Sequence, residues 1–130
     1  MQCPSRQYAD VIVAIPAGRI DHAAAQEFEQ ALAPLLAQAA TRRSGVILDF
    51  SGVEYISSVG LRVLMVAAKT LRPLGARIGV AALKPLVAEI FAISRFDSVL
   101  DVAPSVRAAL AQMSPAAVAA FDAAAPAAQR

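Results

Sequence analysis

Residues 45–65 have the sequence GVILDFSGVEYISSVGLRVLM. The first six of these residues contain four large apolar side chains, and such a nearly continuous apolar run is typical of a strand that is covered on both faces. From Leu61 onward the large apolar residues recur at steps of three or four, which predicts an amphipathic helix. The stretch therefore predicts a central strand, a turn, a short extended segment over residues 53–56, and a helix that begins at a pair of serines.

The segment upstream predicts two further strands. Residues 11–15 are mostly β-branched and precede Pro16 and Gly18, so they predict a strand that ends in a turn. A weaker strand is expected before it, around residues 2–8. Asp21 is placed to cap the helix that follows, because its carboxylate can accept the amide hydrogens of a first helical turn.

That first helix is expected from His22 to about Ala40, because large apolar residues recur in it at helical spacing. Pro34 lies inside the segment, and we expect it to bend the helix or end it early, since proline lacks the amide hydrogen that the helix needs. The helix that follows the serine pair should stop at Pro73 and Gly75.

The rest of the chain continues the alternation of strands and helices. The pattern predicts a strand over residues 76–81, a helix from Pro85 to Phe91 or Ile93, a strand over residues 99–102, and a helix from Pro104 to about Met113. This order favours an α/β fold: one domain over residues 1–113, with a mixed central β-sheet of four or five strands and about four α-helices. Residues 114–130 are rich in alanine and proline, so a flexible tail is expected there, although its alanines could form a partial helix.

The composition narrows the possible functions. The chain has 130 residues, of which 58% are apolar and 17% charged, with a formal net charge of +2, which fits one compact domain. Aromatic residues make up 5% and tryptophan is absent, so base-stacking surfaces are scarce and no direct nucleic-acid binding is expected. No apolar run reaches the roughly 18 residues of a membrane span, and no signal peptide is evident. We therefore expect a cytoplasmic protein without membrane insertion.

The sequence lacks the components of common catalytic and metal sites. Cys3 and His22 are the only residues of their types, so they offer no group of three or four metal ligands. The glycines are dispersed and match no phosphate-binding loop. Glu27 and Glu29 are two residues apart on a predicted helix, so they point in different directions and cannot share one substrate proton. We expect no enzyme, no metal and no cofactor.

The serine pair, Ser57 and Ser58, is the feature that points most clearly to chemistry. Helix capping is one explanation for a serine at a helix start. The other is a phosphoacceptor, because a phosphoserine would add roughly −1.5 to −2 charges beside the amide end of the helix, which favours anions. The helix would then tolerate a modification that strongly changes the surface.

Three segments resemble a known family. Residues 48–64, LDFSGVEYISSVGLRVL, resemble the signature of STAS domains, in particular of bacterial anti-sigma factor antagonists. Residues 18–21, GRID, resemble the turn before the first helix of that family, and residues 91–100, FAISRFDSVL, resemble its third helix and last strand. The resemblance spans roughly residues 8–113 and keeps the order of elements, so it implies a STAS-like fold.

The resemblance also implies a role for the serine pair. The switch serine of the family lies two residues before a Gly-Leu pair, which corresponds to Ser58. The family commonly has Asp where this chain has Ser57, and often Ser or Thr where it has Val59. The missing carboxylate could alter recognition by a kinase, and Ser57 becomes a second candidate for phosphorylation. Gly60 is implied to let the chain pack closely at the start of the helix.

By this resemblance the protein is expected to be an anti-sigma factor antagonist in a partner switch. Unphosphorylated, it would bind a serine-kinase anti-sigma factor of the GHKL type, or an equivalent switch protein, and so release the other client of that kinase. Phosphorylation of Ser58 would eject it, a phosphatase would restore binding, and ATP would belong to the partner. The expected docking surface consists of Gly18, Asp21, Ser57, Ser58, Arg62 and Met65, whereas Leu61 and Leu64 are expected in the core.

A second hypothesis belongs to a different class. The chain could be a STAS-like scaffold that binds a transporter subunit or a signalling assembly constitutively, with Ser58 serving only as a helix cap. Replacing Ser58 by alanine distinguishes the two. A switch predicts loss of phosphorylation with the kinase bound permanently, whereas a cap predicts mainly about 1 kcal/mol of lost stability.

Overall fold

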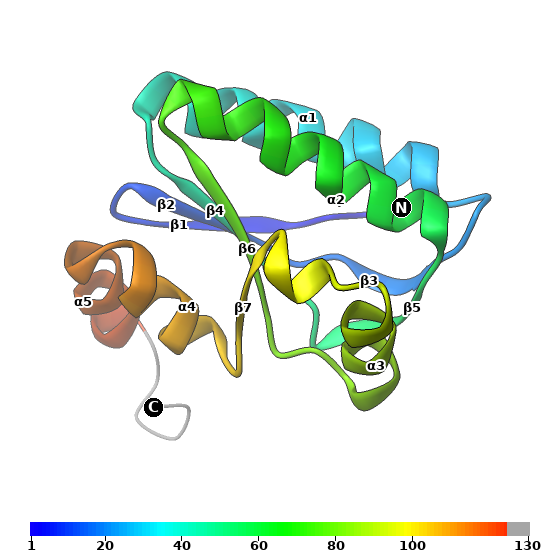
Figure 1. Cartoon of the computed structure of the whole chain (residues 1–130). Coiled ribbons are helices and arrows are strands. Elements are labelled where there is room, and N and C mark those ends of the chain that lie inside the picture. The colour runs from blue at the N-terminus through cyan, green and yellow to red at the C-terminus, as the bar shows by residue number, and fades with distance from the viewer. Residues whose placement is uncertain (125–130) are drawn as a thin grey trace.

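The fold is given by a computed structural model that describes residues 1–124. Its centre is a five-stranded sheet in the order β1-β2-β4-β6-β7 (Figure 1). These strands are β1 (Ser5–Tyr8), β2 (Val11–Ala14), β4 (Gly45–Asp49), β6 (Arg77–Ala81) and β7 (Asp101–Ala103). β1 is antiparallel to β2, and the other neighbours are parallel. The sheet is therefore mixed and β4 is its central strand, as predicted.

A second sheet and three groups of helices complete the fold. The second sheet pairs β3 (Ala17–Ile20) with β5 (Gly52–Ile56) in parallel. α1 (Ala25–Arg42) and α2 (Ser58–Leu71) lie side by side on one face of the large sheet, α4 (Val106–Met113) and α5 (Pro115–Ala124) lie on the other, and α3 (Pro85–Ile93) packs on β5 (Figure 1). Short 3-10 turns, η1 (Arg72–Leu74) and η2 (Phe96–Ser98), follow α2 and α3. The predicted α/β class is confirmed.

The central strands are buried on both faces because helices cover both sides of the sheet. In β4, Val46 and Leu48 face the larger core under α1 and α2, while Ile47 faces the smaller core under α4 and α5. β2 alternates in the same way, with Ile12 on one side and Val13 on the other. Alternate side chains of each strand therefore enter different cores. Because both cores are buried, both strands appear in the sequence as continuous apolar runs.

The predicted turn after β2 is wrong, because residues 17–20 form strand β3 instead. Pro16 stands just before the strand, where its missing amide hydrogen removes no ladder bond. The pairing of β3 with β5 shifts its register between Gly18 and Arg19, and Gly18 has φ +89°, a conformation that glycine adopts readily. Ile20 is fully buried and anchors the strand.

α1 starts later than predicted and passes through its proline. Residues 22–24 form a turn, in which the Ala24 amide donates to Asp21 Oδ1 at 2.9 Å, and the helix starts at Ala25. The prediction that Pro34 ends the helix early is wrong: the helix continues to Arg42. Pro34 is exposed, and buried side chains on both sides of it hold the helix to the core.

The C-terminal part differs most from the prediction. The last strand spans Asp101–Ala103 rather than residues 99–102, and α4 begins after Ser105, which accepts from the Ala108 amide at 3.1 Å. Residues 115–124, expected in a flexible tail, form α5, which agrees with the alternative of a partial helix. Residues 125–130 of the predicted tail lie outside the described part of the chain.

α5 packs because its few large side chains meet partners from distant segments. Phe121 contacts Tyr8 edge to face, with ring centroids 5.3 Å apart. Arg107 donates to both carboxylate oxygens of Asp122, at 2.9 and 2.8 Å. Ala117 is fully buried in the smaller core. The prediction of an unpacked tail is therefore wrong for this helix.

Candidate functional site

The candidate site lies where β3 and β5 end side by side. Ile20 pairs with Ile56 in the last register position of the two strands, and the Ser57 amide donates to the Ile20 carbonyl at 2.8 Å. Asp21 and Ser57, the next residues of the two strands, therefore leave the same edge of the sheet. A helix or turn follows each of them, so the starts of α1 and α2 lie close together (Figure 1).

Ser57 is the cap of α2. Its backbone is extended, with φ −83° and ψ 170°, and its hydroxyl accepts from the Gly60 amide at 3.2 Å. Its carbonyl accepts the first helical bond, from the Leu61 amide at 2.9 Å. The hypothesis that Ser58 serves as the cap is therefore wrong, because that role belongs to Ser57.

Ser58 is the first residue of α2 and is exposed. Within residues 1–124 its hydroxyl makes no hydrogen bond. The amide groups of the first turn lack helical partners and carry the positive end of the helix dipole, which favours a negative group there. A phosphoryl group added to Ser58 would therefore break no side-chain contact and would meet a favourable backbone field.

Gly60 holds this end of α2 tightly against the strand ends. A Cβ at this position would lie 2.8 Å from Ile56 Cγ1 and 2.9 Å from Ile20 Cγ2, closer than van der Waals contact. Only a hydrogen fits, so the helix start has a fixed position relative to β3 and β5. The close packing expected at Gly60 is confirmed.

Asp21 and Gly18 differ in their distance from the serines. Asp21 is half-buried beside Ser57 and accepts the Ala24 amide, so its carboxylate already holds the turn before α1. Gly18 is exposed but lies three residues back along β3, about 10 Å from Asp21 at the rise of a strand. The strand ends bring Asp21, Ser57 and Ser58 together and leave Gly18 apart.

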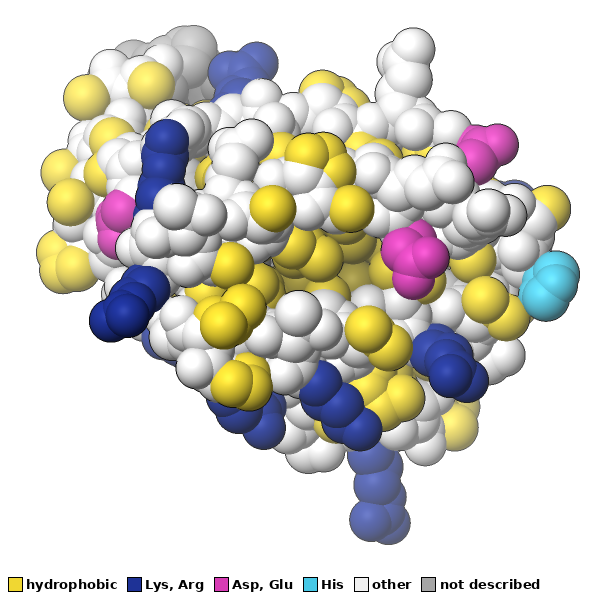
Figure 2. Space-filling model, turned by 90° about the horizontal axis from the view of Figure 1, so that it is seen from above, with side chains coloured by type: hydrophobic (Ala, Val, Ile, Leu, Met, Phe, Trp, Pro, Cys, Tyr) yellow, Lys and Arg dark blue, Asp and Glu magenta, His cyan; other side chains and the backbone are white. Residues whose placement is uncertain are grey.

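A groove starts beside Ser58 and runs between α1 and α2. Its cavity is about 350 Å³. Figure 2 shows this helical face of the molecule, with apolar side chains exposed in a hollow between the helices and charged side chains around it. The lining residues are His22, Ala25, Gln26 and Glu29 from the α1 side and Val59, Arg62, Val63 and Val66 from α2. The groove thus combines an apolar floor with charged edges.

The other two α2 residues predicted for docking, Arg62 and Met65, occupy different environments. Arg62 is exposed and lines the groove, and it lies four residues after Ser58, on the same face of the helix. Met65 is half-buried and packs against the larger core. Leu61 and Leu64 are buried, as expected.

Sequence reasoning missed most of the groove. Val59, Val63 and Val66 recur at steps of four and three, which places them on one face of α2. Val66 is 47% exposed and Val59 is half-buried, so part of this stripe is open to solvent, although Val63 also packs against the larger core. The spacing was visible in the sequence, but only the packing of α1 beside α2 shows that the stripe remains open.

Other reactive groups lie away from this site. Burial raises the pKa of the Cys3 thiol above its ordinary value, which disfavours the reactive thiolate. Among residues 1–124 no three His, Cys, Asp or Glu side chains are grouped so that they could hold a metal ion. In the same part of the chain, no helix has the length and apolar character needed to cross a membrane.

Comparison with known protein families identifies a match to one family. The family model described as "Mlab, STAS domain" matches residues 6–106 of this chain. BtrV of Bordetella bronchiseptica strain RB50, named as a candidate anti-sigma factor antagonist, is 40% identical over 101 residues, which cover 78% of this chain and 84% of BtrV.

Solved structures agree with this result. An anti-sigma factor antagonist from Mycobacterium paratuberculosis superposes with a TM-score of 0.75 at 25% identity, covering 85% of this chain and 92% of the other. A candidate anti-sigma factor antagonist from Thermotoga maritima gives a TM-score of 0.76 at 18% identity, covering 85% and 92%. The second likeness concerns the fold alone.

Proposed function

The chain belongs to the STAS domain family and is related to anti-sigma factor antagonists, and we propose that it acts as an antagonist whose partner binding is controlled by phosphorylation of Ser58. Unphosphorylated, it binds a serine-kinase anti-sigma factor or an equivalent switch protein. The kinase brings ATP and modifies Ser58, and a phosphatase reverses the modification. The switch operates in the cytoplasm, where sigma factors act.

The observation that carries this proposal is the exposure of Ser58 at the opening of α2. Its hydroxyl is free of side-chain contacts among the described residues, whereas the Ser57 hydroxyl is committed to the Gly60 amide. A kinase can therefore reach Ser58 without disturbing the helix cap. Modification of Ser57 would have to break or distort the cap, so Ser58 is the favoured acceptor.

The groove between α1 and α2 provides the docking surface. Val59 lines it directly after Ser58, and Val63 and Val66 extend its apolar floor along α2. A partner that covers this floor up to the start of α2 also covers Ser58, because Val59 directly follows it. Burial of apolar area stabilises the unphosphorylated complex.

Phosphorylation acts on this contact through charge. A phosphoserine carries roughly −1.5 to −2 charges and strong acceptor oxygens. Arg62, on the same helical face, and the first-turn amides stabilise it in the free protein. In the complex the same group would lose water without a prepared partner, which costs several kcal/mol. The difference between the two states drives release.

The acceptor is tested by incubating the purified chain with ATP and serine kinases from the same cell, followed by phosphopeptide mass spectrometry. We expect one phosphate on Ser58, its loss in Ser58→Ala, and its retention in Ser57→Ala. Ser51→Ala is the matched control, because Ser51 is also exposed but lies in the turn before β5. Modification at Ser57, or a tightly bound kinase that modifies neither serine, would contradict the proposal and favour a constitutive scaffold.

The groove is tested separately by two charge substitutions. Val66→Asp places a carboxylate on the groove floor and should weaken kinase binding at least tenfold, measured by calorimetry. Leu74→Asp is the control, because Leu74 is 49% exposed, much like Val66 at 47%, but lies in η1. Equal loss of binding in both variants would remove the groove from the docking surface.

A further inference from the structure

α2 carries a line of cations on the face that presents Ser58. Arg62, Lys69 and Arg72 follow Ser58 by 4, 11 and 14 residues. At about 100° per residue, these steps bring each of the three cations within about 40° of Ser58 around the helix axis. Arg72, the C-cap, keeps a helical backbone with φ −54° and ψ −50°, so the spacing holds to the end of the helix. The three cations therefore form a basic ridge that starts beside Ser58 and is about 21 Å long when measured from it.

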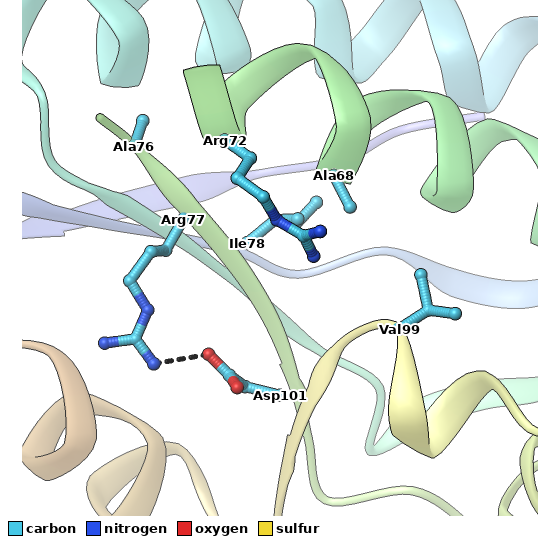
Figure 3. Close-up of a pocket in the computed structure, with 7 residues that line it drawn as sticks. All are labelled: Ala68, Arg72, Ala76, Arg77, Ile78, Val99 and Asp101. Atoms are coloured by element: carbon cyan, nitrogen blue, oxygen red, sulfur yellow. Dashed lines mark hydrogen bonds and ion pairs between the residues drawn. The ribbon is translucent and has the colours of Figure 1, made fainter. Parts of the chain in front are cut away.

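The charges of the basic ridge are not neutralised within the described chain. All three side chains are exposed, and within residues 1–124 none of them makes an ion pair or a side-chain hydrogen bond. α2 contains no acidic residue that could pair with them along the helix. In the hollow beside Arg72, the carboxylate of Asp101 is paired with Arg77 instead (Figure 3). The ridge thus presents three positive charges to a partner.

Helix stability alone does not explain the basic ridge. Lys69 and Arg72 lie at the carboxyl end of α2, where cations interact favourably with the helix dipole, but Arg62 lies in the second turn, toward the positive amino end. Lys69 and Arg72 are three residues apart, so their like charges repel each other. Because the arrangement brings little stability to the free helix, binding explains it better.

The basic ridge borders the groove between α1 and α2. Arg62 belongs to both, because it lines the groove and shares the helical face of Ser58. A protein that lies along α2 can therefore cover the apolar floor and the charged ridge together. Nucleic acid fits this surface less well, because the chain has few aromatic side chains on which bases could stack.

We propose that the basic ridge docks an acidic surface of the serine-kinase anti-sigma factor, formed by a cluster of Asp and Glu side chains that lies along α2. This inference rests on the proposed function, because it describes the same partner. Opposite charges on the two surfaces speed their encounter and fix their relative orientation. The guanidinium groups of Arg62 and Arg72 suit carboxylates in particular, because each can donate two parallel hydrogen bonds to one carboxylate.

Phosphorylation of Ser58 then changes the charge of the ridge itself. A phosphoserine carries roughly −1.5 to −2 charges, which reduces the three positive charges of this face to little more than one. Arg62 lies four residues away on the same face, so it pairs with the phosphate and is withdrawn from the partner. The acidic surface of the kinase now meets a like charge at the start of the ridge, and the contact is weakened there.

The test is calorimetry with the purified serine-kinase anti-sigma factor and the full, unphosphorylated chain. The ridge variant carries three substitutions, Arg62→Gln, Lys69→Gln and Arg72→Gln. At about 0.1 M salt its affinity should be at least tenfold lower than that of the unsubstituted chain. Raising the salt to about 1 M shortens the Debye length from about 10 to about 3 Å and should remove most of this difference. Glutamine is a good helix former, so the fold should be retained, which circular dichroism checks.

The control variant removes the same net charge at other places. It carries Arg6→Gln, Arg42→Gln and Arg43→Gln, which replace three exposed cations on β1 and at the end of α1. Its affinity for the kinase should change far less than that of the ridge variant. Equal losses in the two variants would show that only net charge matters and would overturn the proposal.

The remaining outcomes separate the basic ridge from the switch. Equal affinity of the kinase for the unsubstituted chain and the ridge variant would overturn the ridge and leave the switch at Ser58 standing. A ridge variant that loses affinity, while phosphorylation of Ser58 changes nothing, would support the ridge and contradict only the switch. A kinase that does not bind the unsubstituted chain would overturn both. If vesicles of phosphatidylglycerol distinguish the two chains and the kinase does not, the ridge faces a membrane and the proposal is overturned.

Discussion

The two ends of α2 differ in how they are held. At the N-terminal end Gly60 lies so close to Ile20 and Ile56 that no side chain fits, and Ser57 caps the helix from the adjacent strand end. At the C-terminal end the helix passes into η1 and leaves a hollow beneath Arg72. The tightly packed end presents its one free hydroxyl, Ser58, in a defined position, whereas the open end leaves the exposed guanidinium of Arg72 without a side-chain partner among residues 1–124. Packing, rather than sequence pattern alone, distinguishes the two ends.

The largest effect should come from filling the space at the packed end. Gly60→Val would place methyl groups inside the contact with Ile20 and Ile56 and should lower the free energy of unfolding by about 3 kcal/mol. Urea denaturation measures this change. Gly75→Ala, at the open end, serves as the comparison.

Gly75→Ala should lower the free energy of unfolding for a different reason. Gly75 has φ +76°, but the nearest atoms to a Cβ there lie 3.7 Å away, so only backbone strain of about 1 kcal/mol is expected. If Gly60→Val destabilised the chain no more than Gly75→Ala, the packed end of α2 would not be held as we describe.

An intermediate effect should separate the two serines. Ser57→Ala removes the acceptor for the Gly60 amide and should cost about 1 kcal/mol of stability. Ser58→Ala removes an exposed hydroxyl and should change stability by no more than about 0.5 kcal/mol. Both are measured by urea denaturation, and the opposite order of the two costs would return the cap to Ser58.

The smallest effect should come from the open end. Arg72→Gln and Lys69→Gln replace exposed cations near the end of α2, and each should change stability by no more than about 0.5 kcal/mol. Thermal unfolding of the free proteins checks this. A loss of several kcal/mol in Arg72→Gln would show that Arg72 holds the end of α2 in place, contrary to the description of this end as open.

The sequence predicted the parts of the fold that have strong periodicity. The run from Gly45 to Phe50 is typical of a strand covered on both faces, and the apolar steps of three and four after Ser58 are typical of a helix packed on the core. β3 was missed because it has only four residues and because Pro16, just before it, and Gly18, within it, are typical turn residues. Its partner β5 is distant in sequence, so no local sequence pattern predicts the pairing of the two strands.

α5 was missed for a related reason. Its alanines carry too little apolar area to predict packing, and the contact that holds it joins Phe121 to Tyr8 at the other end of the chain. At the site, the sequence located the serine pair but could not say which serine caps the helix. That choice depends on the backbone angles of Ser57 and its distance to the Gly60 amide.

The most direct measurement is the affinity of a serine-kinase anti-sigma factor for the chain with and without a phosphate on Ser58, determined by calorimetry on purified proteins. A penalty of about 3 kcal/mol for enclosing the new charge corresponds to affinity at least a hundredfold weaker for the phosphorylated chain. Circular dichroism should show α2 intact in both forms. Equal affinity of the two forms, or release that occurs only because the phosphorylated chain unfolds, would contradict a charge switch at Ser58.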